Sequence, residues 1–402
     1  MTSLAEKVAQ AALDCFSALP QKCKPRTAAG GRKEWTPLAA VVISRGHDDA
    51  IVECLSLGTG TKCLPAVAVP NCHGAVLHDS HAEVLALRGF NRWLLQEIHY
   101  QLVNLNYTSP YLIRQIPREG DRHSKPFRLA DDVSLYFFAT EAPCGDASME
   151  LLIGSKTPED AIPWELPSSD SSLPGRGHFS ILGAVRRKPA RADAQASMSK
   201  SCSDKLAIKQ ATSILSFPVD LLVQRTPNTF LSALIIPSSQ YNETGYHRAF
   251  GPTGRMQSID SDNVLFFNVI SLPHNAVRFQ FEKRRNDLEP AKASNVSALW
   301  IRGYNEIAGH SIEVLLNGVK QGFKQFEHHR GKESMVCRKQ MWLQGSIIIR
   351  LLQVDALNDG TLSYKNAKND PARSACVEIR NTATQRLGNW HKNAGDDAWT
   401  LT

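Results

Sequence analysis

Three short tracts that lie far apart in this chain carry residues that suit a single metal site. They are His81-Ala82-Glu83, Pro143-Cys144-Gly145 and Ser201-Cys202-Ser203-Asp204-Lys205. An imidazole nitrogen and two thiolate sulfurs are preferred ligands of zinc, and three protein ligands leave the fourth tetrahedral position open for water, as in catalytic sites. The sequence therefore predicts a fold that brings these distant segments together around one zinc ion.

The order of the first two tracts indicates a particular chemistry. An H-x-E triplet followed by a P-C pair is the signature of zinc nucleobase deaminases, in which the glutamate moves protons and does not bind the metal. That signature normally ends in C-x-x-C, but Ala147 occupies the position of the second cysteine here. We therefore expect His81, Cys144 and Cys202 to bind zinc and Glu83 to transfer protons. Zinc lowers the pKa of a bound water to about 7.

Each expected ligand lies near the predicted start of a helix, after Asp79-Ser80, after Pro143 and after Ser199-Lys200-Ser201. The positive end of a helix lowers the pKa of a cysteine and favours the thiolate that zinc requires. Taken singly, the motifs are weak. An H-x-E triplet arises by chance roughly once in two chains of this composition, and cysteine is also a common buried residue. Their combined order and context favour the metal site.

A second set of ligands is an alternative. Cys72, His73, His78 and His81 all lie within ten residues of one another. A closed structural site would use all four, and their spacing matches none of the usual zinc-finger patterns. We therefore favour the catalytic set over this one.

Hydrophobic patterning predicts an α/β fold. Apolar residues recur at helical spacing over residues 1–19, after Asp79 or Ser80, and over residues 202–215. The apolar, β-branched and aromatic run over residues 133–140 is typical of a buried strand. Further blocks that predict strands or helices cover residues 38–44, 51–57, 231–236, 264–272, 296–301, 312–316 and 347–354.

The remaining segments predict loops and no domain boundary. Residues 154–177 are rich in Ser, Pro, Gly and Asp, which predicts a long surface insertion. Residues 58–62 predict a glycine-rich loop that lacks the spacing of a Walker P-loop. We find no internal repeat and no linker, and expect a single domain over residues 1–402.

Composition places few limits on the function. The 402 residues are 42% hydrophobic and 21% charged, as in ordinary soluble proteins. The net charge of +7 suits a nucleic-acid substrate but is shared by many other enzymes. The first residues lack the apolar segment of a secretory signal peptide. No run approaches the ~18 apolar residues of a membrane-spanning helix. The nine cysteines therefore indicate reduced thiols or metal ligands. We expect an intracellular protein, cytoplasmic or nuclear, without a membrane or evident protein partner.

The motifs together resemble the catalytic domain of the adenosine deaminases acting on RNA. The resemblance covers essentially the whole chain and leaves no room for separate double-stranded-RNA-binding domains, which is typical of the tRNA-specific branch of that family. It implies a cytidine-deaminase-like mixed sheet flanked by helices, with an extended C-terminal half. The residues that carry it are the opening helix, Glu34-Trp35-Thr36, Gly58-Thr59-Gly60-Thr61-Lys62-Cys63, Asp79-Ser80-His81-Ala82-Glu83, Pro143-Cys144-Gly145-Asp146, Ser201-Cys202-Ser203-Asp204-Lys205 and Leu387-Gly388-Asn389-Trp390.

This resemblance implies conversion of adenosine to inosine in tRNA, at the adenosine just 3′ of the anticodon in alanine tRNA. A base in the anticodon loop is not locked in a duplex, so flipping it costs less than the few kcal/mol of unpairing. RNA contacts are implied for Thr61, Lys62 and Arg191. Relatives tend to carry glycines around the arginine, which here stands between two alanines.

The resemblance also implies inositol hexakisphosphate enclosed within the fold. Buried cations are costly unless they are paired, and a polyphosphate can pair many of them at once. Two positions that hold cations in the family are Leu87 and Ile208 here, and Asp79 with Lys205 is expected to connect the metal to the polyphosphate. The residues expected to bind it are Arg88, Lys205, Arg338, Tyr364, Lys368, Trp390 and Lys392.

Two other functions compete with RNA deamination. A non-catalytic RNA-binding relative could keep the same fold, but the intact Glu83 argues against a protein that has lost its chemistry. A deaminase of free nucleosides would need neither this length nor clusters of cations such as Arg186-Arg187-Lys188 and Lys283-Arg284-Arg285.

Overall fold

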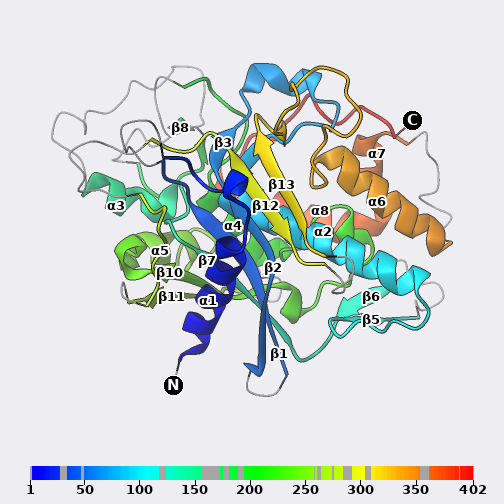
Figure 1. Ribbon diagram of the computed structural model, residues 1–402, viewed down its shortest axis with the longest axis horizontal. Helices are drawn as coiled ribbons and strands as arrows, with labels where there is room; N and C mark the ends of the chain where they lie inside the picture. The colour runs from blue at the N-terminus through cyan, green and yellow to red at the C-terminus, as the bar shows by residue number, and fades with distance from the viewer. Residues whose placement is uncertain are drawn as a thin grey trace.

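The structure is a computed structural model whose centre is one mixed β-sheet with helices on both faces (Figure 1). It describes residues 2–401 with the exception of residues 28–33, 47–48, 117–123, 155–172, 175–180, 189–193, 258, 260–263, 274–275, 284–291, 304–308, 354–361 and 389. No helix within the described part of the chain is long and apolar enough to cross a membrane.

The central sheet has eight strands in the order β11-β10-β7-β1-β2-β12-β13-β14. Strand β10 runs parallel to both β7 and β11, and the other neighbours are antiparallel. Two-stranded sheets form from β3 and β4, from β5 and β6, and from β8 and β9. The strands are β1 Leu38–Arg45, β2 Ile51–Thr59, β3 Thr61–Cys63, β4 Asp79–His81, β5 Leu112–Arg114, β6 Phe127–Leu129, β7 Val133–Ala139, β8 Leu173–Pro174, β9 Arg186–Arg187, β10 Leu231–Pro237, β11 Asn268–Leu272, β12 Ser297–Ile301, β13 Ser311–Leu316 and β14 Val319–Lys320.

Helices cover the two faces of this sheet and create two apolar cores. Alternate side chains of a strand point to opposite faces, so in β1 Val41 packs in the core that holds α2, whereas Val42 packs in the core that holds α1. Burial on both faces explains the continuous apolar sequence of this strand. The helices are α1 Leu4–Ser17, α2 Ala82–Val103, α3 Met149–Ile153, α4 Cys202–Thr212, α5 Glu243–Phe250, α6 Arg338–Leu351, α7 Tyr364–Lys368 and α8 Ser374–Leu387.

Most of the expected elements are confirmed, including a mixed sheet flanked by helices. Residues 58–62, expected to form a glycine-rich loop, instead end β2 and begin β3, with Gly60 at a φ of +129° between them. Asp79 and Ser80 belong to β4 and do not cap α2, because pairing with β3 keeps them extended. Residues 347–351 of the block expected at 347–354 form the end of α6. The insertion expected at 154–177 lies largely outside the described residues.

The start of α2 packs unusually close to β2, at Gly58. A Cβ atom at this position would lie 2.6 Å from both the Ala82 carbonyl oxygen and the Leu85 Cβ. Since such contacts require the backbone of one element to shift, only glycine fits here. Gly58 therefore sets the distance between the sheet and the helix that carries the H-x-E tract.

We predict that Gly58→Ala lowers the free energy of unfolding in urea by about 1–3 kcal/mol, as overpacking of a core does. Gly154→Ala is the matched control. Gly154 follows α3 with right-handed helical backbone angles, and its nearest heavy atom would lie at an ordinary 3.4 Å. The control should stay within about 0.5 kcal/mol of the parent. Equal losses in the two variants would contradict the close approach.

Candidate active site

His81 ends β4 and is the N-cap residue of α2. Asp79 holds it in place: its Oδ1 accepts a hydrogen bond from the His81 backbone N at 3.0 Å and lies 2.9 Å from Nδ1 of the ring. A carboxylate beside Nδ1 favours the tautomer in which that nitrogen carries the proton. The other ring nitrogen, Nε2, then has a lone pair for a metal, the arrangement usual for metal-binding histidines.

The two predicted cysteine ligands meet beside this histidine. Cys144 lies in the turn after β7, before Gly145 at a φ of +103°, and Cys202 is the first residue of α4. The Cys202 backbone N donates to Cys144 Sγ at 3.4 Å, and the Ser203 N donates to the Cys144 carbonyl at 3.0 Å. A hydrogen bond between the two thiol groups lowers the pKa of Cys144 well below its ordinary value, and His81 hydrogen-bonds to the same sulfur. Cys144 is thus in contact with both of the other expected ligands, His81 and Cys202.

Arg255 connects the two segments that carry Cys144 and Cys202. Its Nη1 donates to Asp204 Oδ1 at 2.6 Å, and its Nε lies 3.5 Å from Asp146 Oδ2. Both carboxylates are fully buried, and each lies two residues after one of the cysteines, Cys144 or Cys202. A single arginine therefore fixes the turn after β7 against the start of α4, which sequence patterns did not reveal.

Glu83 lies in the first turn of α2 and is only 7% exposed. Burial raises the pKa of its carboxyl group, the neighbouring Cys144 raises it further, and His81 and Lys188 act in the opposite direction. A raised pKa brings the carboxyl group closer to neutral pH, where an acid–base catalyst can both accept and donate a proton. The position and environment of Glu83 suit proton transfer beside the ligand cluster.

Lys188 is a site residue that the sequence did not single out. Its Nζ lies 2.8 Å from Asp79 Oδ2 and 3.3 Å from Cys202 Sγ, and its side chain is buried. Burial alone would lower its pKa, but Asp79 and the two cysteines raise it well above the ordinary value of lysine. The only signal in the sequence was a short basic run, Arg186-Arg187-Lys188, which is a pattern more often found on solvated surfaces.

Two of the expected polyphosphate-binding residues, Lys205 and Arg88, lie close to the ligand cluster. Lys205 forms an ion pair with Asp79, on the same oxygen that Lys188 contacts. Arg88, on α2, donates from Nε to the Val336 carbonyl at 2.6 Å, and burial lowers the pKa of its guanidinium group. The connection between Asp79 and Lys205 that the sequence led us to expect is present.

The C-terminal half supplies further cations to the same region. Tyr364 is buried, and its ring stacks on Trp399 with the centroids 4.5 Å apart. Lys368 follows on the same helix, α7, where burial among protein atoms and then the nearby arginines Arg380, Arg338 and others lower its pKa to about 7. Lysines in such surroundings are destabilised as cations unless an anion joins them.

The sequence did not single out several other cations near α4 and α7. Burial, followed by repulsion from Arg380, lowers the pKa of Lys209 to about 7, and burial with repulsion from Lys205 lowers that of Lys200 to about 8. Two cations make cation–π contacts with the ring of Trp390: Lys200 Nζ lies 5.7 Å and the Arg380 guanidinium carbon 6.0 Å from its centroid. The expected residue Lys392 follows Trp390 closely and has an exposed side chain.

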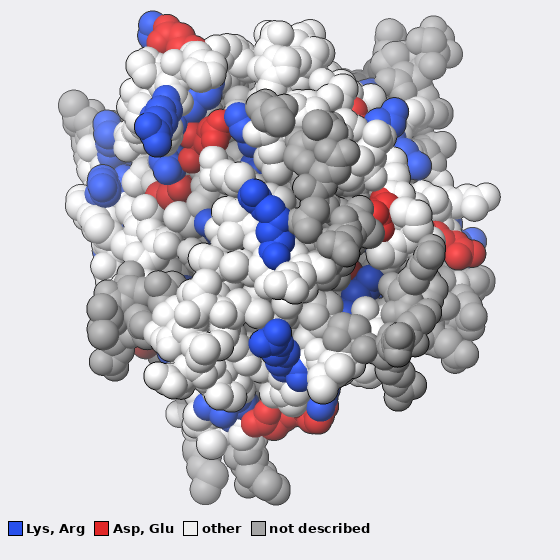
Figure 2. Space-filling view, turned by 90° about the vertical axis from the view of Figure 1, so that its right-hand side faces the viewer, with Lys and Arg blue, Asp and Glu red and all other residues white. Residues whose placement is uncertain are grey.

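The expected RNA contacts lie beside the ligand cluster where the structure describes them. Thr61 and Lys62 belong to β3 and pair in register with His81 and Ser80 of β4. Arg191 falls outside the described residues. Figure 2 shows Lys and Arg on one face of the molecule as separate groups between uncharged residues and not as one continuous stripe, so that face alone does not mark a path for RNA.

The alternative zinc set is not assembled as the sequence allowed. His81 is held by Asp79, and the His73 side chain is exposed. Cys72 and His78 do come together in the described part of the chain, but with Asp396 as their third member.

Comparisons with known proteins agree with this geometry. Residues 56–394 match the family model of the adenosine-deaminase (editase) domain. The tRNA-specific adenosine deaminase 1 of Schizosaccharomyces pombe is 35% identical over 340 residues, 83% of each chain. The enzyme of the same name from Saccharomyces cerevisiae is 31% identical over 355 residues, 84% of this chain and 82% of the relative. The double-stranded RNA-specific adenosine deaminase of Mus musculus is 30% identical over 144 residues, 36% of this chain and 11% of that protein. The chain therefore belongs to the adenosine-deaminase (editase) domain family.

Proposed function

We propose that this protein is a zinc-dependent enzyme that converts adenosine to inosine in tRNA. One observation carries the proposal: His81, Cys144 and Cys202 meet beside a buried, intact Glu83. The match to tRNA-specific deaminases over most of the chain supports tRNA as the substrate. We extend the catalytic domain to residues 1–402, because β1, which precedes the matched residues 56–394, forms the middle of the central sheet.

Zinc fits the residues present. One imidazole nitrogen and two sulfurs form the donor set of catalytic zinc sites in nucleobase deaminases, and Asp79 leaves Nε2 of His81 free to bind. Lys188 lies beside Cys202 Sγ and offsets thiolate charge. When bound, zinc supplies a Lewis acid that lowers the pKa of a coordinated water to about 7.

Glu83 would carry the protons of the reaction. Its carboxylate accepts a proton from the attacking water, delivers it to a ring nitrogen of adenine, and finally donates a proton to the departing ammonia. The balance is adenosine plus water giving inosine plus ammonia. Burial of Glu83 excludes bulk water that would compete for these protons.

We further propose the adenosine 3′ of the anticodon in alanine tRNA as the target, in an intracellular setting. A loop nucleotide needs little energy to flip into a pocket, and Thr61 and Lys62 flank the ligand cluster where the flipped nucleotide would enter. Arg191 is proposed as a further RNA contact. Sequencing of total tRNA for inosine after incubation with the purified protein tests the assignment. Conversion of free adenosine without any inosine in tRNA would favour a nucleoside deaminase, and no conversion of either would favour a binding protein.

We also propose that inositol hexakisphosphate is enclosed beside α7. Lys368 and Arg380 have accessible side chains, yet burial among protein atoms lowers the pKa of both groups. A bound anion would stabilise both groups as cations. The acid Asp220 is already paired with Arg373, whose Nη2 lies 2.6 Å from Oδ2. A polyphosphate would neutralise the surplus of positive charge.

The shell of cations differs from the one implied by the family resemblance. Lys209 lies next to Ile208 on α4, and Arg380 lies on α8, which packs against α4. These two residues supply positive charge in the region where Leu87 and Ile208 provide none. Arg88, Lys205, Arg338, Tyr364, Trp390 and Lys392 complete the proposed set.

We predict that Glu83→Gln lowers the deamination rate by about 10²- to 10⁴-fold, the contribution typical of a general acid–base group. Glutamine keeps the size of the side chain but cannot accept and return a proton. The zinc content should equal that of the parent protein by elemental analysis. A variant that purifies with less zinc would show that Glu83 is a ligand and contradict its proposed role.

Cys202→Ala should lose one equivalent of zinc relative to the parent, together with all deaminase activity, because only two protein ligands would remain. Cys15→Ala is the control, since Cys15 lies on α1 and packs in the core on the opposite face of the sheet. The control should keep its zinc and its activity. Retention of full zinc content by Cys202→Ala would overturn the ligand assignment.

For the polyphosphate, acid extraction of protein from a eukaryotic host should release about one inositol hexakisphosphate per chain, since ligand binding is linked to folding. Lys368→Met should weaken its retention by about 10- to 100-fold, the equivalent of one lost charged hydrogen bond. Lys365→Met, one turn away on α7 and exposed, should retain it. A stable, active protein without any phosphate-rich ligand by mass spectrometry would rule the proposal out.

A further inference from the structure

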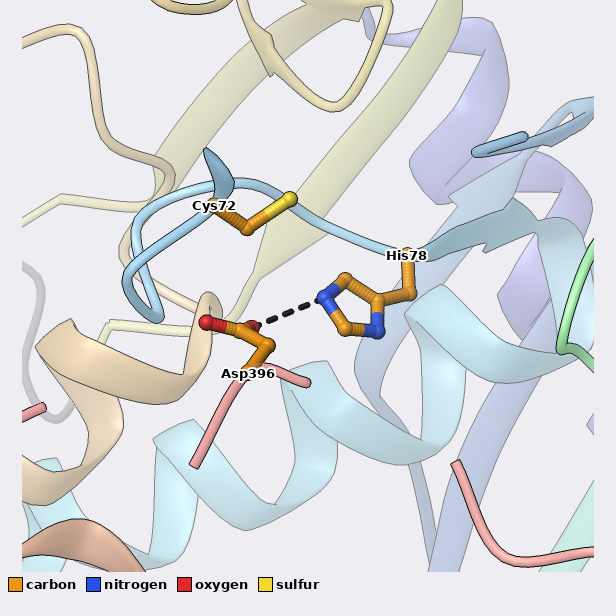
Figure 3. Close-up of side chains that lie close together, drawn as sticks. All are labelled: Cys72, His78 and Asp396. Carbon is orange, nitrogen blue, oxygen red and sulfur yellow. Dashed lines mark ion pairs between the residues drawn. The ribbon is translucent and has the colours of Figure 1, made fainter. Parts of the chain in front are cut away.

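A second cluster of potential metal ligands lies apart from Glu83 and the predicted zinc site. Cys72 follows the short 3₁₀ helix Ala66–Asn71, His78 directly precedes β4, and Asp396 lies near the end of the chain. Figure 3 shows these side chains gathered from segments that are distant in sequence. One ligand atom from each lies within 4.8 Å of the other two, and the group is largely buried.

Hydrogen bonding leaves this cluster incompletely satisfied. His78 Nε2 forms an ion pair with Asp396 Oδ2 at 2.8 Å (Figure 3), whereas Nδ1 is buried without a hydrogen-bond partner. Cys72 Sγ contacts the Ala68 carbonyl at 3.4 Å. Buried polar groups are normally hydrogen-bonded, so a buried imidazole with an unsatisfied nitrogen indicates that a partner is absent from this cluster.

The carboxylate of Asp396 is held firmly for such a role. Its Oδ1 accepts from the Gly74 backbone N at 2.6 Å, and its Oδ2 accepts from Arg338 Nη1 at 3.2 Å. A carboxylate offers about four lone-pair sites, so these two hydrogen bonds leave capacity for a cation. Hydrogen-bonded partners of this kind commonly orient the carboxylate ligands of metals.

We propose that Cys72, His78 and Asp396 bind a second zinc ion, with solvent completing the tetrahedral coordination. The combination of sulfur, nitrogen and oxygen donors suits zinc and excludes calcium and magnesium, which prefer oxygen ligands alone. On binding, the Cys72 thiol releases its proton to solvent, and the thiolate and the carboxylate balance the charge of the ion.

This ion would fasten the C-terminal segment to the loop that leads into β4. His78 immediately precedes Asp79, whose carboxylate positions His81, Lys188 and Lys205. A metal at His78 therefore supports the catalytic strand from outside the site. Glu83, the proposed proton carrier, lies beside the other cluster. The contribution proposed for this ion is therefore to hold the C-terminal segment against the loop before β4, although its fourth position is open to solvent.

Zinc content per chain tests this assignment. Protein purified without chelators should contain two equivalents, which should fall to one in Cys72→Ala, to one in Cys202→Ala and to none when both are changed. His73→Asn is the matched control: His73 adjoins Cys72, is exposed and has a φ of +46°, which asparagine tolerates. The control should keep both equivalents. Unchanged zinc content in soluble Cys72→Ala would overturn the proposal.

A second measurement needs no variant that might misfold. Crystals of the unaltered protein, measured on both sides of the zinc absorption edge, should show two anomalous peaks. One should lie among Cys72, His78 and Asp396, and the other among His81, Cys144 and Cys202. A single peak at the latter cluster, even after soaking in zinc, would refute the second site and leave the proposed function intact. A single peak at the former would support the second site and refute the catalytic zinc.

Discussion

The structure around the active site depends on one buried carboxylate, that of Asp79. It contacts His81 through Oδ1 and both Lys188 and Lys205 through Oδ2. Burial alone would raise its pKa, but the two lysines and the histidine hold it well below the ordinary value. A carboxylate buried without these partners would be strongly destabilising. Asp79 thus orients His81, the proposed metal ligand, and connects it to Lys188 and Lys205.

The C-terminal half covers the two helices, α2 and α4, that begin at the proposed zinc ligands His81 and Cys202. Helix α6 packs against α2, and α8 packs against α4, so each helix that starts at a proposed zinc ligand is covered by a later one. The covering helices α6, α7 and α8 bring Arg338, Lys368 and Arg380 close to one another. Positive charge that accumulates inside a fold repels itself and opposes folding, unless an anion is incorporated. The polyphosphate proposed above would therefore couple ligand binding to assembly of the site.

The sequence predicted what local patterns encode. Strand β1 was predicted because burial on both faces leaves an unbroken apolar run. His81, Cys144 and Cys202 were predicted as zinc ligands because of the combined order of their tracts, and the structure places Cys144 in contact with the other two. Zinc binding by these residues stays a prediction. Lys188, Arg255 and Asp396 were missed because their partners come from segments that are remote in sequence. The same limit explains the error at residues 58–62, since pairing with β1 and β12 extends residues 58–59 and pairing with β4 extends residues 61–62.

The displaced third cysteine shows how tertiary contacts replace a local motif. Ala147 occupies the position at which the C-x-x-C signature has its second cysteine. Its backbone N donates a hydrogen bond to Ser203 Oγ at 3.1 Å. The same hydroxyl donates to the Pro143 carbonyl at 2.9 Å. Ser203 therefore joins the turn after β7 to the first turn of α4, and this junction delivers Cys202 to Cys144. Because that cysteine arrives on a separate helix, zinc binding would depend on the docking of α4 and on everything packed against it.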